Sequence, residues 1–172
     1  MSFQSILDAM SIDTKNEIIE MDKFLKSLHP LKFKRTADKK KINYVCADYG
    51  VSYAIFPNST RLRHEPSQTF GWYYLCDRET KEWYRKTDYF VQILTAIGKN
   101  DPQAVERIFG AANSCLSCKG YQCSAISYTY EGVQKSACYG RIVFQLRQDD
   151  FNDVRNFFSH LNALLIEEKC CI

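Results

Sequence analysis

The chain of 172 residues is poor in the residues that interrupt regular structure, with seven glycines and four prolines. It contains no low-complexity tract and no internal repeat, which argues against a disordered or repeat-built protein. Only three histidines are present, and none stands in a pattern with a nucleophile and a carboxylate that would form a catalytic triad. Glycine-rich phosphate loops and dinucleotide-binding fingerprints are also missing. These absences favour a non-enzymatic protein over an enzyme.

Long apolar runs are missing as well, since no stretch approaches the roughly 18 residues that a membrane span needs. The first residues, Met1 to Ser5, lack the charged head and apolar run of a signal peptide. We therefore expect a cytoplasmic protein with no membrane partner. Thiols stay reduced in that compartment, so eight cysteines point to metal or redox chemistry before disulfides.

The pattern of apolar residues predicts an α+β protein. Helical spacing predicts helices over residues 14–28, 88–98, 101–112 and 150–167, the first opened by a capping box from Thr14 to Glu17. Alternating residues predict strands at 42–46, 51–56, 72–76, 82–85, 125–130, 133–138 and 141–147. Helices and strands come in separate runs. The sequence therefore predicts one domain over residues 1–172, an antiparallel sheet of about five to seven strands with N-terminal, middle and C-terminal helices packed against it.

Four of the cysteines have the spacing of a metal site: Cys115, Cys118, Cys123 and Cys138. A C-x2-C turn brings two thiolates together, and a two-residue turn at Glu131-Gly132 would pair Ala125 with Cys138. Cys123 would then lie diagonal to Cys138 on the same face of this hairpin. Four converging thiolates suit tetrahedral zinc, so we expect a cysteine-cluster hairpin at 115–138. An iron–sulfur cluster, a redox disulfide and inert buried thiols stay open as alternatives.

The run Cys115-Leu116-Ser117-Cys118-Lys119-Gly120-Tyr121-Gln122-Cys123, followed by Tyr130-Glu131-Gly132 and Cys138, resembles a group of uncharacterised proteins from anaerobic low-GC Gram-positive bacteria. Phe70-Gly71-Trp72 upstream is similar too. The resemblance covers the later two-thirds of the chain, and the cysteine spacing is its specific part. It implies support for the cysteine site and no particular activity or substrate.

Aromatic residues crowd into one segment and form a second candidate site. A ligand pocket there would be lined by Trp72, Tyr74, Trp83 and Tyr89, with His64 and Arg63 from the polar loop before them. The alternative is that these aromatic side chains form a sheet face packed on helices. The pocket would serve a small molecule or a protein partner that the sequence does not name.

A basic loop at residues 32–41 is the third candidate, with Lys32, Lys34, Arg35, Lys39, Lys40 and Lys41. Nucleic-acid binding needs such charge interleaved with aromatic residues, and only Phe33 and Tyr44 are near. A solvated loop is therefore the favoured interpretation. The leading hypothesis is a small binding or structural module with a zinc site and an aromatic pocket. A redox enzyme or sensor using the cysteines, and a nucleic-acid-binding module using the basic loop, are the alternatives.

Overall fold

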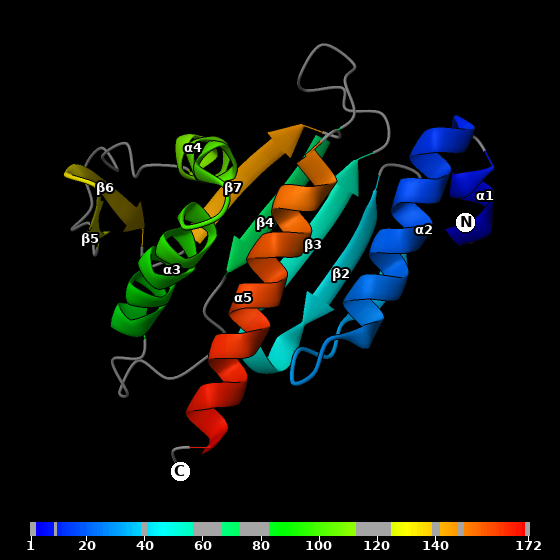
Figure 1. The fold of residues 1–172 in the computed structure, drawn as a ribbon. Helices are drawn as coiled ribbons and strands as arrows, with labels where there is room; N and C mark the ends of the chain where they lie inside the picture. The colour runs from blue at the N-terminus through cyan, green and yellow to red at the C-terminus, as the bar shows by residue number, and fades with distance from the viewer. Residues whose placement is uncertain are drawn as a thin grey trace, which may run out of the picture.

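The computed structural model describes residues 3–8, 10–38, 41–56, 67–72, 83–112, 125–138, 142–147 and 150–170. Helices and strands are mixed along the chain (Figure 1). In order they are α1 (Phe3–Leu7), α2 (Ile12–Ser27), β1 (Lys34–Ala37), β2 (Ile42–Cys46), the 3-10 turn η1 (Ala47–Tyr49), β3 (Val51–Phe56), β4 (Ser67–Trp72), α3 (Trp83–Gly98), α4 (Pro102–Ala111), β5 (Ala125–Tyr130), β6 (Val133–Cys138), β7 (Ile142–Arg147) and α5 (Phe151–Cys170).

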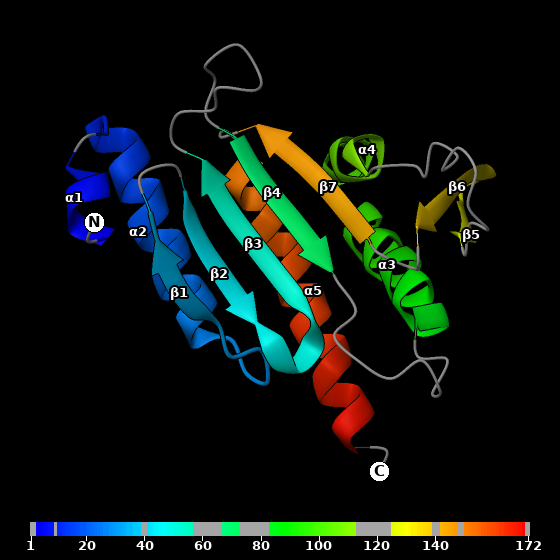
Figure 2. The same cartoon turned by 180° about the vertical axis from the view of Figure 1, so that it is seen from behind.

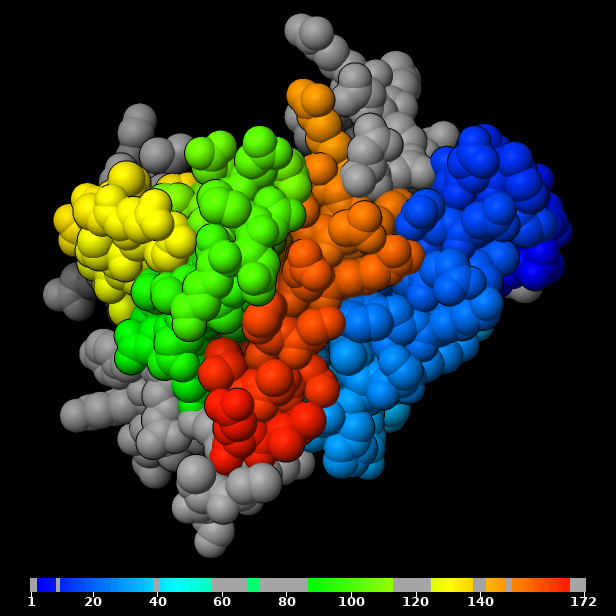
Figure 3. Space-filling view, viewed as in Figure 1, coloured from blue at the N-terminus to red at the C-terminus, as the bar shows by residue number. Residues whose placement is uncertain are grey.

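The described strands form a five-stranded sheet in the order β1-β2-β3-β4-β7 and a separate two-stranded hairpin, β5-β6. Every neighbouring pair is antiparallel. Helices from the N-terminal, middle and C-terminal parts lie over one face of the large sheet, and Figure 2 looks onto its opposite face. The predicted α+β class is therefore confirmed. From the helix side, α5 lies between α2 and the α3–α4 pair, with the hairpin beyond them (Figure 3).

Aromatic rings in a row across four strands form the centre of the core. Register places Tyr44 beside Tyr53, Tyr53 beside Phe70, and Phe70 beside Phe144. All four side chains are fully buried. Helix α5 packs Phe157 against this row, with its ring centroid 4.7 Å from that of Phe70. Edge-to-face contacts of this kind add to the free energy gained from burying the rings, so α5 and the sheet form one core.

Helix α2 begins earlier than the capping-box pattern predicts. Its N-cap is Ser11, whose hydroxyl accepts a hydrogen bond from the amide of Thr14 at 3.4 Å. Thr14 therefore lies inside the first turn, because a suitable cap stands three residues before it. The inner face of the helix buries Ile18, Met21 and Leu25, and Phe24 and Leu28 are half-buried.

The strand predicted at residues 82–85 is wrong, because α3 already begins at Trp83. Aromatic residues favour strands, but packing against neighbours overrides that preference. Thr87, Phe90 and Leu94 are buried at spacings of one helical face, so the helical pattern extends further toward the N-terminus than was predicted. Asp88, predicted as the cap, is an exposed residue within the helix.

Residues 34–37 form the edge strand β1, where the sequence predicted part of a basic loop. Its alternation turns Arg35 toward α2 and α1. The guanidinium of Arg35 lies 2.7 Å from the carboxylate of Asp22 and 3.7 Å from the ring centroid of Phe3. That guanidinium is thus engaged inside the protein. Lys34 is exposed, and Lys39 and Lys40 lie outside the described residues.

The C-terminal elements follow the predictions closely. Helix α4 has Asp101 as its N-cap, which accepts from the amide of Ala104 at 2.9 Å, and Pro102 at its start. Strand β7 buries Ile142, Phe144 and Leu146 by alternation. Helix α5 buries an apolar stripe from Phe151 to Leu165, apart from Leu164, which is half-buried. In the described parts of the chain, no helix combines the length and apolar character that a membrane crossing takes.

Candidate functional site

The hairpin β5-β6 has the register that its turn predicted. Ala125 pairs with Cys138, and Tyr130 pairs with Val133. The two turn residues have left-handed backbones, with φ of 47° at Glu131 and 78° at Gly132. Positive φ at both central residues is the signature of the tight turn that matches the twist of antiparallel strands. Cys138 is therefore the last residue of β6, at the open end of the hairpin.

The other three predicted metal ligands, Cys115, Cys118 and Cys123, lie outside the described residues, and for Cys138 the structure describes the backbone. Among the side chains that are described, no three of His, Cys, Asp or Glu come together in a way that would hold a metal ion. The four-cysteine site stays a prediction. Cys46, by contrast, is a free, buried thiol in the core, and burial raises its pKa.

Lys135 of β6 fastens the hairpin to the end of α4. Its ammonium donates to the carbonyl oxygens of Phe109 and Ala112, the latter at 3.0 Å, and lies 4.4 Å from the ring centroid of Phe109. The last carbonyls of a helix lack partners within the helix and carry partial negative charge, so a lysine ammonium suits them. Ala112 also forms a β-bridge with Phe144 of β7. The chain therefore leaves α4 for the cysteine segment at a point held by both sheets.

The predicted aromatic pocket is described only in part. Trp72 ends β4, where its register partners are Val51 and Ile142, and Trp83 begins α3; the backbone of each is described. Tyr89 is half-buried on α3 and packs against the core. Tyr74, His64 and Arg63 lie outside the described residues. A pocket made by these six residues stays a prediction.

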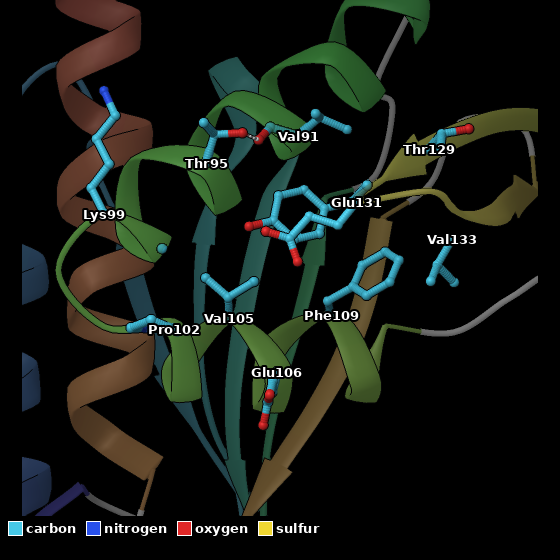
Figure 4. A pocket seen from close by; sticks show the side chains of 12 residues that line it. Val91, Thr95, Lys99, Pro102, Val105, Glu106, Phe109, Thr129, Glu131 and Val133 are labelled. Carbon is cyan, nitrogen blue, oxygen red and sulfur yellow. Dashed lines mark hydrogen bonds between the residues drawn. The ribbon is translucent and has the colours of Figure 1, made fainter.

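A groove that the sequence did not predict lies between α3, α4 and the turn of the hairpin (Figure 4). Its volume is about 610 Å³. The lining residues come from three separate parts of the chain: Val91, Thr95, Gly98, Lys99, Pro102, Val105, Glu106, Phe109, Thr129, Tyr130, Glu131 and Val133. The Tyr130-Glu131-Gly132 turn was visible in the sequence. Nothing in the sequence showed that two helices would pack beside it.

Tyr130 is the central aromatic residue of this groove. Its ring centroid is 5.5 Å from that of Phe109, and a Cβ placed on Gly98 would lie 3.1 Å from its hydroxyl oxygen. Burial, the charge of Glu131 and a hydrogen bond to that carboxylate raise the pKa of Tyr130. The hydroxyl therefore stays protonated at neutral pH. Absence of a side chain at Gly98 is what lets the tyrosine lie this close to α3.

A cluster of charged residues surrounds Asp22 of α2, near the edge strand β1 and away from the groove. Its carboxylate accepts from Lys26 and Arg35, both at 2.7 Å, and from the hydroxyl of Tyr44 at 3.1 Å. Burial raises the pKa of Asp22, but the three donors together outweigh it, so the net pKa is lowered. With its acceptor oxygens occupied by side chains of α2, β1 and β2, the carboxylate joins these elements and is a structural group.

No protein-family model, curated protein or solved structure matches this chain. The function proposed below therefore rests on the residues and their geometry alone.

Proposed function

We propose that this protein is a metal-binding module in which Cys115, Cys118, Cys123 and Cys138 share one ion, with zinc as the metal that four thiolates suit best. The observation that carries the proposal is the pairing of Ala125 with Cys138. Ala125, two residues after Cys123, therefore lies directly beside the fourth cysteine, Cys138.

The distances allowed by the chain support a shared ion. Paired Cα atoms in antiparallel strands lie about 4.5–5.5 Å apart. Cys123 precedes Ala125 by two residues, which span at most roughly 7 Å. The chain therefore allows the thiolates of Cys123 and Cys138 to approach one ion, and the Cys115-x2-Cys118 turn would supply the remaining pair.

A closed site of four thiolates leaves no open coordination position for a substrate. Bound zinc would then stabilise the hairpin and the segment that enters it, without taking part in a reaction. The hairpin is already fastened at one side by Lys135 on the end of α4. The metal would fasten the open end, and the module would serve for binding or support.

Elemental analysis of protein purified without chelator tests the proposal. We expect one zinc per chain, and loss of that zinc to a moderate chelator in Cys138→Ser at concentrations that leave the wild type loaded. Cys46→Ala is the matched control, because Cys46 is buried far along the chain from the hairpin and should not change the metal content. Wild-type protein without metal would overturn the proposal, and iron with a brown colour would replace zinc by an iron–sulfur cluster.

A further inference from the structure

The groove beside the hairpin turn has apolar walls and an aromatic centre. Val91 of α3 and Val105 and Phe109 of α4 line it, together with Val133 at the start of β6. Val133 is 53% exposed, which makes it one of few large apolar side chains among the described residues that face solvent. A volume of about 610 Å³ lies in the range of small-molecule sites, about 300–1,000 Å³. The groove thus has the size and the apolar lining that a small organic ligand needs.

Glu131 is an unusual residue for its position in the turn. Both residues of such a turn have positive φ, and Asn, Asp or Gly adopt that conformation most readily. A glutamate with φ of 47° is therefore in a disfavoured conformation, whereas Gly132, with φ of 78°, has no Cβ and adopts a positive φ readily. An outlier of this kind at a cavity is a reason to ask what its side chain does.

The carboxylate of Glu131 points toward the middle of the groove, whereas Lys99 extends away from it (Figure 4). Glu106 lies on the far side of α4 from the Glu131 carboxylate in the same view. Within the described part of the chain, no cation forms an ion pair with Glu131. The ammonium of Lys135 is held by the carbonyls of α4 instead. Among the described side chains, the charge presented to the middle of the groove is therefore negative.

We propose that this groove binds a small primary alkylamine as its ammonium cation, with the ammonium on the Glu131 carboxylate and the Tyr130 ring and the alkyl chain on Val105, Phe109 and Val133. A carboxylate accepts the ammonium hydrogens in charge-assisted hydrogen bonds. An aromatic face beside it attracts the same cation through the ring quadrupole. The apolar walls then remove the alkyl chain from water. This site uses none of the cysteines, so the two proposals, the amine site and the metal centre, can be tested independently.

Titration of the full-length protein with 1-aminohexane, followed by amide chemical shifts, tests the proposal. Sodium hexanoate and 1-hexanol are the matched probes, with the same chain length and a negative or neutral head. We expect saturable binding of 1-aminohexane with shifts centred on residues 129–133 and on α4, and at least about tenfold weaker binding of both other probes. Equal binding of hexanol or hexanoate, or no saturable binding of the amine, would overturn the proposal.

Two substitutions of equal charge change separate the groove from general electrostatics. Glu131→Gln should weaken the binding of 1-aminohexane at least about tenfold, because it removes the negative charge and keeps the shape of the side chain. Glu167→Gln removes the same charge from the same protein at an exposed position of α5 that does not line the groove, so we expect less than about a twofold change. Similar losses in the two variants would reduce the site to surface charge and contradict the assignment.

Glu131→Asn adds a readout that a purely structural glutamate would not give. Asparagine tolerates the left-handed conformation better, so the melting temperature should rise by about 2 °C while binding of 1-aminohexane is lost. A fall in melting temperature together with unchanged binding would contradict the proposal. A peptide with one lysine side chain that binds more tightly than 1-aminohexane would also overturn it, in favour of a protein partner.

Discussion

The ammonium of Lys135 lies 3.0 Å from the carbonyl oxygen of Ala112, so a strand of the small sheet directly caps the helix that precedes it. Ala112 is the C-cap of α4 and pairs with Phe144 of the large sheet. One residue thus joins a helix, a hairpin and the central sheet. The same contact leaves Lys135 unable to neutralise the groove at the turn of the hairpin, where Glu131 lies.

Replacing Lys135 with methionine tests the importance of this cap. Methionine keeps an apolar stem on the Phe109 ring but has no donor for the carbonyls of α4. We expect the free energy of unfolding to fall by about 1–2 kcal/mol, measured by urea denaturation. Gln134→Met, at the exposed neighbouring position, is the control and should leave the midpoint unchanged. Equal midpoints for the two variants would show that the capping hydrogen bonds contribute nothing.

Metal removal should act on the hairpin and leave the main core folded. If zinc holds the open end of β5-β6, a strong chelator should lower the melting temperature of the wild type by about 4 °C or more. The same chelator should have no effect on Cys138→Ser. Proteolysis should then cut between Ala112 and Ala125 before it cuts elsewhere, because the aromatic row of the large sheet does not depend on this segment. A wild type indifferent to chelator would contradict the metal proposal.

Acid should remove the contribution of Asp22 to stability. Its pKa is lowered in the folded protein from the ordinary value of 3.8, so the unfolded chain binds the proton more readily. The contribution is therefore fully present above the unfolded pKa and is lost as the pH falls through the folded one. We expect Asp22→Asn to cost about 1–3 kcal/mol at pH 7, with the partly exposed Lys26 contributing little of it.

The loss of unfolding free energy in Asp22→Asn should be constant from pH 5 to 8 and should shrink below about pH 4, as measured by urea denaturation at each pH. Glu20→Gln breaks the exposed ion pair with Lys23 on the same helix and serves as the control. It should leave the urea midpoint at pH 7 unchanged. A difference between wild type and Asp22→Asn that persists undiminished at pH 2.5 would show that the carboxylate charge is not what matters.

Phe70 should be among the most costly side chains to remove. Its ring is stacked on Phe144 at 4.6 Å and contacts Phe157 and Phe158 of α5. We expect Phe70→Ala to lower the free energy of unfolding by about 3–5 kcal/mol. Phe56→Ala removes the same atoms from a half-buried ring that faces away from the helices, so its cost should be less than half as large. Comparable losses would indicate that the opposite face of the sheet is equally well packed.

Local turn chemistry explains which parts of the fold were predictable. The register of β5-β6 follows from two residues, Glu131 and Gly132, because a two-residue turn admits only one pairing of its strands. Helix α4 was equally readable from Asp101 and Pro102. These signals act over a few residues and need no knowledge of the rest of the chain.

Long-range packing explains which parts were missed. The strand character of Lys34–Ala37 comes from its pairing with β2, and its own residues alternate only weakly. The early start of α3 depends on the burial of Thr87 and Phe90 against other elements. The groove forms only where α3, α4 and the hairpin turn pack together, and no local sequence pattern predicts that packing. For the cysteine site the sequence supplies the spacing and predicts the pairing of Ala125 with Cys138, and the structure confirms that pairing.

The place of β7 in the sheet has a consequence for how the protein is made. Strand β4 pairs with β7, although α3, α4 and the hairpin all lie between them in the chain. A ribosome therefore releases β1 to β4 long before the strand that completes the sheet. Until then β4 has an open edge with Phe70 on it, the kind of surface that templates aggregation. Pairing of β7 with β4 is thus the last step in forming the sheet. Chains truncated before β7 should depend on chaperones to stay in solution.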